Sequence, residues 1–339
     1  MNKALFLSVV VPAKNEEANI SRCLDSLIRA ASSFTQTEII LVDCSSTDKT
    51  ISIAKNYPIK ILQLKPNWLH SASAARYIGT LFASGKFIFF IDADMALEAG
   101  FLEKALDILD KDSRLAAAGG IAKEVYLKNG EIVGYKSNLY QTKDTVRKVL
   151  FLAGAVLYRK KALLEVSGFN PYIRAAEENE LAQRLRQKGY GLVSIPFPMA
   201  IHYTASLSEW QEFMRKKKMG LFLGIGEAMR ISHSVKYLCE ALLFYKEFAL
   251  FLFFILYVLA ITIYSLISGY IKYLGFIFLP LCLLFIYLVF KKKRVKTALI
   301  SLIKWFIISI DIAHGLAIPV KDRKTYPTDP YIIKGGFNV

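Results

Sequence analysis

Acidic side chains follow three apolar runs in the first third of the chain. Asp92 and Asp94 come directly after the run Phe87–Ile91, while Asp43 and Glu16 follow two earlier runs. Two carboxylates at this spacing can bind different partners, one a ribose hydroxyl and the other a divalent cation that bridges a diphosphate. Mg²⁺ and Mn²⁺ prefer such oxygen ligands and are often held by only one or two protein carboxylates. The pattern favours a nucleotide site, although an Asp-X-Asp sequence alone also occurs in solvated turns.

The runs that precede these acids have the composition of buried strands. Apolar stretches without alternation, separated by segments of helical periodicity, indicate parallel strands joined by helices. The expected strands are Leu5–Pro12, Glu38–Val42, Ile59–Leu64 and Phe87–Ile91, with helices from Ile20, from about Thr47 and over Ser71–Ala83. Ligands of open parallel sheets bind at the carboxyl ends of the strands, where the acids stand. We therefore predict an α/β fold with a doubly wound nucleotide-binding half, completed by residues 115–205.

The last third of the chain predicts membrane helices. The whole chain has 54% apolar residues, 21% charged residues and a mean hydropathy of +0.35. Phe248–Ile271 gives 24 residues without a charge and Tyr273–Phe290 another 18, each close to the length of a bilayer span. The basic cluster from Lys291 to Lys296 follows at once, and the positive-inside rule makes it cytosolic. We expect a helical hairpin, with two buried helices of a soluble core as the alternative.

The segment Ala298–Val320 leaves two placements open. Ser301, Lys304, Asp311 and Gly315 fall on one helical stripe, so the helix either lies in the interface or spans with that stripe turned inward. A spanning helix would place the basic residues after Val320 outside the cell. The charge bias therefore favours an amphipathic or re-entrant segment.

The charge balance indicates lipid rather than nucleic acid. Lysine and arginine number 44 against 28 acids, and residues 215–339 hold 18 of these bases against 6 acids. Because this excess flanks apolar runs and no nucleic-acid module is recognisable, anionic lipid head groups are the expected partner. The N-terminal segment has no cleavage pattern of a signal peptide, so we expect the first half to stay in the cytoplasm.

Five ordered segments resemble family 2 glycosyltransferases of the GT-A fold. They are SVVVPAKNEEANISRCLDSL (8–27), EIILVDCSSTDKT (38–50), SASAARYIG (71–79), FIFFIDADM (87–95) and SGFNPYIRAAEENELAQRLRQKGY (167–190). The resemblance covers roughly residues 5–205 and implies inverting transfer of a sugar from a nucleotide-sugar donor. It implies that donor contacts come from Pro12, Glu16, Asp43, Arg76, Asp92, Ala93 and Asp94.

The resemblance also assigns roles within this set. Asp43 would read the base, Asp92 the ribose, and Asp94 the divalent cation, Mg²⁺ or Mn²⁺. His202 resembles a histidine that some members place near the metal or the diphosphate. Arg76 resembles the arginine of an Ala-Arg-Asn motif near the diphosphate, although Tyr77 replaces the asparagine. Each residue also has a purely structural alternative, as a cap, a turn, a solvated side chain or a buried histidine.

The resemblance places the catalytic base at Glu178. Inverting transfer requires a carboxylate that accepts the proton of the attacking hydroxyl, and family members commonly carry Glu-Asp at the start of a helix for this. Here Glu178 occupies the Asp position, which lengthens the side chain by one methylene and leaves Glu177 or Glu180 as substitutes. An acidic first turn that counters the helix dipole is the structural alternative.

We therefore predict a catalytic domain over residues 1–235 and a membrane region over residues 236–339. The predicted enzyme is a multi-pass membrane protein with a cytoplasmic catalytic domain, acting on a hydroxyl of a lipid-linked or glycan acceptor. Trp210–Gly220 resembles a basic juxtamembrane helix that contacts lipid phosphates. The rival enzyme is a polyprenyl-phosphate glycosyl synthase, whose phosphate acceptor needs no base. A non-catalytic membrane scaffold is the alternative from another class.

Overall fold

The computed structural model describes residues 7–136, 145–231 and 235–335. The chain forms two compact units, the first from Met1–Glu209 with Lys321–Val339 and the second from Trp210–Val320. The predicted membrane region covered residues 236–339, whereas the second unit begins at Trp210 and ends at Val320. Residues 210–231 form helices that pack within the second unit, and the residues after Val320 return to the sheet of the first.

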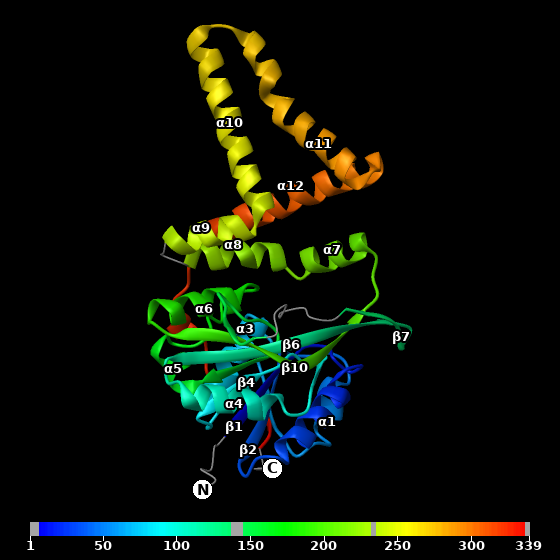
Figure 1. Cartoon of the computed structure of the whole chain (residues 1–339), viewed down its shortest axis with the longest axis vertical. Helices are drawn as coiled ribbons and strands as arrows, with labels where there is room; N and C mark the ends of the chain where they lie inside the picture. Colours follow the sequence, from blue (N-terminus) through cyan, green and yellow to red (C-terminus); the bar gives the residue numbers. More distant parts are fainter. Residues whose placement is uncertain (1–6, 137–144, 232–234, 336–339) are drawn as a thin grey trace. The chain divides into compact units, whose positions relative to one another are not determined.

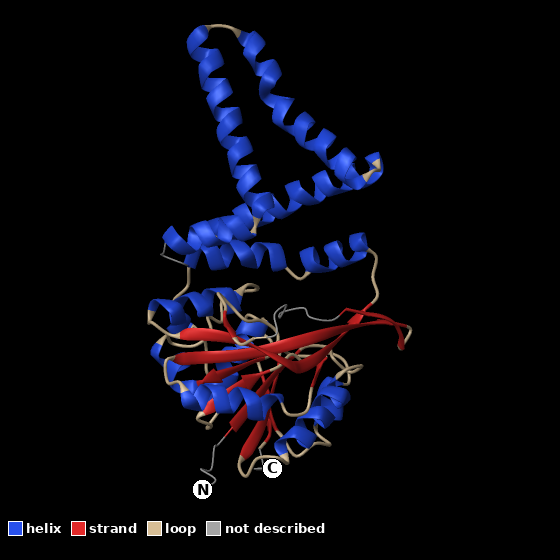
Figure 2. Ribbon diagram, in the orientation of Figure 1, coloured by secondary structure: helices blue, strands red, loops and turns tan. Residues whose placement is uncertain are grey.

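A mixed sheet forms the centre of the first unit (Figures 1 and 2). Its order is β11-β3-β2-β1-β4-β9-β6-β10-β5, with β7 paired to β6 and β8 to β10. The strands are β1 (Leu7–Ala13), β2 (Thr37–Asp43), β3 (Lys60–Gln63), β4 (Phe87–Phe90), β5 (Met95–Leu97), β6 (Leu115–Lys128), β7 (Glu131–Lys136), β8 (Arg147–Lys148), β9 (Val156–Arg159), β10 (Gly191–Ala205) and β11 (Tyr331–Lys334). The predicted parallel pairing of the first four strands is confirmed.

Helices cover both faces of this sheet. Helices α1 (Ile20–Ala31), α2 (Thr50–Ala54) and α4 (Phe101–Lys111) pack on one face; α3 (Ala72–Phe82), α5 (Lys160–Glu165) and α6 (Glu177–Gln187) pack on the other. The strand period of two residues produces these two cores. Along β1, Val9 and Val11 join the core of α1, whereas Val10 joins that of α3. Burial on both faces explains why the strands read as continuous apolar runs.

Helix α3 packs unusually close to β1 at Gly79. A Cβ added at Gly79 would lie 2.2 Å from Cγ1 of Val10, which is less than any real carbon contact. The start of the helix is fixed by Ser71, whose hydroxyl accepts a hydrogen bond of 3.0 Å from the backbone N–H of Ala74. This close packing fixes Arg76, one turn before Gly79, at the carboxyl edge of the sheet.

The second unit is helical. Its elements are α7 (Glu209–Lys218), α8 (Leu221–Ile231), α9 (Val235–Phe244), α10 (Lys246–Ser268), the 3₁₀-helix η1 (Ile271–Phe278), α11 (Leu279–Lys292) and α12 (Val295–Ala317). Three segments are long and apolar enough to cross a membrane: Phe248–Ser268, Tyr273–Lys292 and Val295–Ala317. They coincide with the segments predicted at 248–271, 273–290 and 298–320.

The chain re-enters the first unit after α12. A short 3₁₀-helix, η2 (Arg323–Thr325), leads to β11, which pairs antiparallel with β3 at the edge of the sheet. The sequence prediction had assigned these residues to the membrane region. A four-residue strand whose partner lies about 270 residues earlier has no local signature, so the assignment missed it.

Candidate active site

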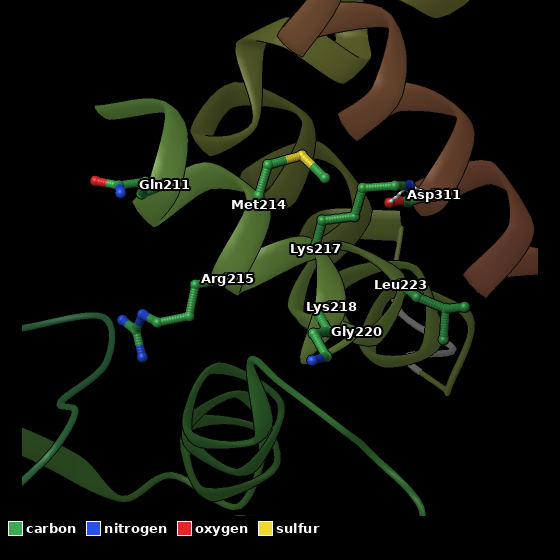
Figure 3. Close-up of a pocket in the computed structure, with 8 residues that line it drawn as sticks. All are labelled: Gln211, Met214, Arg215, Lys217, Lys218, Gly220, Leu223 and Asp311. Carbon is green, nitrogen blue, oxygen red and sulfur yellow. Dashed lines mark hydrogen bonds and ion pairs between the residues drawn. The ribbon is translucent and has the colours of Figure 1, made fainter. Parts of the chain in front are cut away.

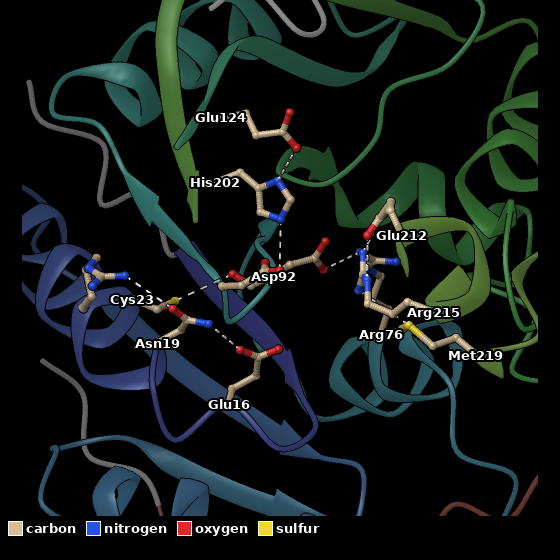
Figure 4. A network of polar contacts seen from close by, with 12 residues as sticks. Glu16, Asn19, Cys23, Arg76, Asp92, Glu124, His202, Glu212, Arg215 and Met219 are labelled. Carbon is tan, nitrogen blue, oxygen red and sulfur yellow. Dashed lines mark hydrogen bonds and ion pairs between the residues drawn. The ribbon is translucent and has the colours of Figure 1, made fainter. Parts of the chain in front are cut away.

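The predicted donor carboxylates gather at one edge of the sheet because the strands before them are parallel. Asp43 ends β2 and lies beside Ala13 of β1, while Asp92 follows β4 on the other side of β1. Figure 4 shows Glu16 and Asp92 on neighbouring loops of this edge. The first unit therefore brings Glu16, Asp43 and Asp92 to one place, as their positions after the strands require.

The loop after β1 is locked to the loop after β2 by side chains and backbone. Asn15 has a φ of 56°, its N–H donates to Ser46 Oγ at 2.8 Å, and its side-chain oxygen accepts from the N–H of Thr47 at 2.9 Å. The N–H of Glu16 donates to Thr50 Oγ1 at 2.8 Å. These bonds hold Glu16 in place. The loop around Asn15 is therefore fixed by contacts within the chain itself.

Glu16 is set in an acidic and partly buried environment. Its Oε2 accepts a hydrogen bond of 2.8 Å from Asn19 Nδ2. The pKa of Glu16 is raised to about 7, mainly by burial; the hydrogen bond from Asn19 opposes this rise, and the nearby charges of Asp94 and Asp92 add to it. A carboxyl with this pKa exchanges its proton readily near neutral pH, so a cation arriving at the site would favour its ionised form.

The two carboxylate oxygens of Asp43 differ in their hydrogen bonds to the described residues. Its Oδ2 accepts from the N–H of Ser46 at 2.9 Å and from Gln63 Nε2 at 3.0 Å. Its Oδ1 is buried and has no hydrogen-bond partner among the described residues. A buried oxygen in this state favours a ligand N–H. Gln63, which orients the carboxylate, was not identified from the sequence, because its contact depends on the pairing of β2 with β3.

A buried arginine links the donor edge to α6. The Arg76 guanidinium donates to Asp92 Oδ1 at 2.6 Å and to Glu177, and lies 3.3 Å from Glu178 Oε1. Burial alone would lower the pKa of Arg76, but Asp92, Glu178 and Glu177 raise it, so the guanidinium stays charged. The structure engages Arg76 with carboxylates of the chain, and its predicted contact with the donor diphosphate stays a prediction.

The two adjacent glutamates of α6 have different surroundings. The Glu177 side chain is 7% exposed and that of Glu178 16%. Burial raises the pKa of Glu177 to about 8, with the charge of Glu178 adding to the rise and Arg76 opposing it. The residue just before the helix, Ala176, is a non-glycine residue with a φ of 60°, which is a sparsely populated conformation. Glu180, the other substitute, is paired with Arg184 at 2.6 Å.

Asp94 and His202, the two predicted metal residues, lie in contact, and a third residue joins them. His202 Nε2 lies 3.0 Å from Asp94 Oδ2. Its Nδ1 lies 3.5 Å from Glu124 Oε1 (Figure 4). His202 and Glu124 stand opposite each other in the pairing of β10 with β6. Asp94 Oδ1 is buried with no hydrogen-bond partner in the described part of the chain. Glu124 was not identified from the sequence, because the pairing of β10 with β6 joins distant segments.

Pro12 and Ala93 are both buried. Pro12 lies within β1, which continues to Ala13, one residue beyond the predicted end of the strand. Ala93 is buried between the two aspartates. Their donor contacts stay predictions.

The second unit has a basic pocket of its own. A cavity of about 680 Å³ is lined by Gln211, Met214, Arg215, Lys217, Lys218, Gly220, Leu223 and Asp311 (Figure 3). Lys217 Nζ donates to both oxygens of Asp311, at 3.0 and 2.8 Å. The mixture of cationic and apolar side chains agrees with the prediction of a basic helix over Trp210–Gly220.

The family model of glycosyl transferase family 2 matches residues 8–178, about half of the chain. The chain belongs to this family. The match contains every predicted donor residue and Glu178, whereas His202 lies beyond it. The first unit is therefore a glycosyltransferase domain.

Curated relatives cover parts of the same region. The chain is 39% identical over 98 residues to the uncharacterized glycosyltransferase YibD of Escherichia coli (28% of this chain, 27% of YibD). It is 30% identical over 158 residues to the poly(ribitol-phosphate) β-N-acetylglucosaminyltransferase TarS of Staphylococcus aureus (44% and 26%). It is 29% identical over 167 residues to the dolichyl-phosphate β-glucosyltransferase of Dictyostelium discoideum (45% and 46%). The chain thus spans half or less of the length of each of these three relatives.

Solved structures confirm the fold. A fragment of TarS in complex with UDP-GlcNAc matches with a TM-score of 0.52 and 21% identity, covering 68% of both chains. GalNAc-T7 with UDP, GalNAc and Mn²⁺ matches with a TM-score of 0.52 and 16% identity, covering 70% of this chain and 49% of that one. The predicted α/β fold of the GT-A type is therefore correct.

Proposed function

We propose that the protein is a membrane-anchored, inverting glycosyltransferase that transfers a sugar from a nucleotide-sugar donor to a hydroxyl of a lipid-linked or glycan acceptor. The observation that carries this proposal is the contact of the buried Arg76 guanidinium with two predicted site residues. One guanidinium contacts Asp92, a predicted donor residue, and Glu178, the predicted base. This contact supports a site in which donor binding and proton transfer take place around one buried cation, because Asp92 and Glu178 reach the same guanidinium from different elements.

The donor in this proposal is a nucleoside diphosphate sugar. The unengaged oxygen of Asp43 would accept an N–H of the base, and the carboxylate of Asp92 a ribose hydroxyl. TarS, which shares the fold, has been crystallised with UDP-GlcNAc. This supports a uridine nucleotide as the first donor class to assay.

Asp94 and His202 are the residues that would hold Mg²⁺ or Mn²⁺. The buried and unpartnered Oδ1 of Asp94 has the chemistry of a ligand oxygen, and the imidazole of His202 stands next to the same carboxylate. The described residues contain no group of three His, Cys, Asp or Glu side chains that would hold a cation alone. A site of this kind suits an ion that takes its remaining ligands from phosphate and water. When bound, the ion would offset the charge that develops on the departing diphosphate.

Glu178 distinguishes the two kinds of acceptor. A hydroxyl must lose its proton as it attacks the anomeric carbon, whereas a lipid phosphate is already ionised near pH 7. Of the three acids that begin α6, Glu177 is bound to Arg76 in the core and Glu180 is bound to Arg184. Glu178 is the more exposed of the two glutamates that contact Arg76. This favours a hydroxyl acceptor. The similarity to a dolichyl-phosphate β-glucosyltransferase is the observation that favours the rival, a polyprenyl-phosphate acceptor.

The membrane is the proposed location, with the first unit in the cytoplasm. Phe248–Ser268 and Tyr273–Lys292 supply the apolar helices, and the cluster from Lys291 to Lys296 supplies the basic flank that the positive-inside rule places there. The pocket around Lys217 and Lys218 adds cationic groups suited to lipid phosphates.

The test compares Glu178→Gln with Glu177→Gln in the full chain. Detergent-solubilised protein is incubated with UDP-sugars and candidate acceptors, and UDP release and donor affinity are both measured. With a hydroxyl acceptor, Glu178→Gln lowers turnover by about 10²- to 10⁴-fold and leaves the donor Kd nearly unchanged. Glu177→Gln, the matched control, lowers thermal stability more and turnover less, because its carboxyl packs in the core.

Three results would decide against this assignment. Near-normal turnover of Glu178→Gln on a lipid phosphate would favour the polyprenyl-phosphate synthase. Loss of donor binding together with turnover would show that Glu178 supports the site and is not the base. Binding of no nucleotide sugar by the unmodified protein would favour a non-catalytic scaffold.

A further inference from the structure

The first unit is built from segments that precede and follow the second unit in the sequence. β11 lies antiparallel to β3, with Tyr331 opposite Gln63 and Ile332 opposite Leu62. Beyond this pairing, Lys334 Nζ donates to the backbone oxygens of Lys55 and Tyr57 at 2.8 and 2.6 Å. The tail from Lys321 onward is thus a structural part of the domain that begins with β1.

Tyr326 anchors this tail in the domain core. It is buried, and its hydroxyl donates to the backbone oxygen of Leu69 at 2.7 Å. Its ring makes edge-to-face contacts with Trp68, Tyr77 and Tyr172, at centroid distances of 5.6, 6.1 and 5.5 Å. A tail bound by both a strand and a buried aromatic residue belongs to the folded domain and cannot lie across a bilayer from it.

This connectivity limits the number of membrane crossings. A chain that leaves a folded domain and returns to the same domain must cross the bilayer an even number of times. Three segments of the second unit are long and apolar enough to span. At least one of them therefore does not cross.

Helix α12 is the segment whose charges oppose a crossing. Phe248–Ser268 and Tyr273–Phe290 contain no charged residue, whereas α12 contains Lys304 and Asp311 in its central turns. Both are held by α7, because Lys217 Nζ lies 2.8 Å from Asp311 and Lys304 Nζ lies 5.5 Å from the centre of the Phe213 ring. Charges in the middle of a spanning helix are costly, whereas a helix in the interface keeps them near water.

The remaining faces of α12 complete an amphipathic pattern. One face packs on α8, where a Cβ added at Gly226 would lie 2.1 Å from the backbone oxygen of Ile312. Another carries the exposed side chains of Leu299, Ile303 and Ile310, which follow one another at helical spacing. The helix is thus polar toward α7 and apolar on a face that the described parts of the second unit leave open.

We propose that α12 lies in the plane of the bilayer, in the leaflet on the side of the first unit, with its face of Leu299, Ile303 and Ile310 buried among lipid chains. Of the three apolar segments among the described residues, α10 and the η1–α11 segment cross and α12 does not, so the tail returns to the catalytic domain. The proposal rests on the membrane anchoring given under the proposed function. The partner of α12 is the region of the bilayer where lipid head groups meet the acyl chains.

The first experiment measures depth along the helix. Positions 299 and 310 are eleven residues apart, so on a spanning helix they would differ in depth by about 16 Å. A fluorophore is attached to Leu299→Cys or Ile310→Cys in full-length protein, with Cys239 and Cys282 replaced by serine. The vesicles hold the protein in one orientation and contain lipids brominated at different depths in one leaflet only. We expect the same quenching profile at both positions.

Helix α10 provides a matched control with the same spacing. Leu252→Cys and Ile263→Cys are also eleven residues apart and exposed on their helix, and we expect their profiles to differ as those of a spanning helix do. Different profiles at both pairs would overturn the in-plane placement of α12. Equal profiles at both pairs would instead contradict the spanning hairpin of the proposed function. The control pair therefore distinguishes failure of the membrane anchoring from failure of the in-plane placement.

The second experiment measures sidedness in spheroplasts with a membrane-impermeant maleimide. Ile267→Cys marks the tip between α10 and η1, Thr328→Cys the tail, and Ser33→Cys the exposed surface of the first unit. We expect labelling of Ile267→Cys in sealed spheroplasts, and of the other two only after permeabilisation. Labelling of Thr328→Cys with protection of Ser33→Cys would show that α12 crosses.

Discussion

Removing the ring of Tyr326 tests whether the C-terminal tail is held in the domain core as described. Tyr326→Ala deletes a buried ring that contacts Trp68, Tyr77 and Tyr172. Truncation of a buried aromatic side chain to alanine typically costs about 3 to 5 kcal/mol. Tyr326→Phe keeps the ring and removes only the hydroxyl bond to the Leu69 oxygen, for which the expected cost is about 1 kcal/mol.

These costs convert into rates of amide exchange in the tail. Because each 1.4 kcal/mol is about tenfold in an equilibrium constant, Tyr326→Ala is expected to raise exchange of the β11 amides by about 10²- to 4 × 10³-fold. Tyr326→Phe is expected to raise it by about 2- to 10-fold. The measurement is hydrogen–deuterium exchange with mass spectrometry on peptides from residues 321–335, in full-length protein in detergent.

The exposed Tyr331 of the same strand provides the matched control. Tyr331→Ala removes the same type of ring from a half-exposed position, and surface substitutions usually change stability by no more than about 0.5 kcal/mol. We expect exchange in the tail to change by about twofold. If Tyr326→Ala exchanged no faster than Tyr331→Ala, the tail would not be anchored by Tyr326, and the even number of crossings would lose its basis.

Three further predictions concern the active site. Asp94→Asn is expected to abolish turnover and the Mn²⁺ dependence of donor binding, because a charged ligand oxygen is lost; full activity of this variant in EDTA would refute the metal site. Burial lowers the pKa of His202, but the hydrogen bond and charge of Asp94 outweigh this and raise the pKa above its ordinary value. Protons therefore compete with Mn²⁺, and the affinity for Mn²⁺ is expected to fall as the pH drops through this raised pKa; an unchanged pH profile in His202→Gln would exclude this origin. Arg76→Ala is expected to destabilise the protein by about 3 to 5 kcal/mol in thermal unfolding, because it leaves buried carboxylates without their cation. Glu177→Gln in the same chain is expected to restore part of that loss, and full additivity of the two substitutions would contradict their contact.

The parallel half of the fold follows from the sequence for a physical reason. Strands buried on both faces must be apolar throughout, so β1 and β4 are visible as uninterrupted runs, and the acids after them fall on the ligand-binding edge. Asp43 and Asp92 were therefore found without knowledge of any contact. Their identification needs only the direction of the strands.

Contacts between distant segments were not predictable in this way. Gln63 reaches Asp43 through the pairing of β3 with β2, and Glu124 reaches His202 through the pairing of β6 with β10. The local sequence of each strand contains no information about its neighbour. β11 shows the same limit most clearly, since its partner precedes it by the whole length of the second unit.

The adjacent pair Glu177 and Glu178 shows how the fold separates two residues that the sequence cannot distinguish. Successive residues of a helix point about 100° apart, so the two carboxylates of α6 must face different surroundings. Glu177 is held against Arg76 in the core, where burial favours its protonated form. Glu178 touches the same guanidinium from a more exposed position. Glu177, the buried one of the two, thus supports the arginine, and Glu178 is the one that we propose to meet the acceptor.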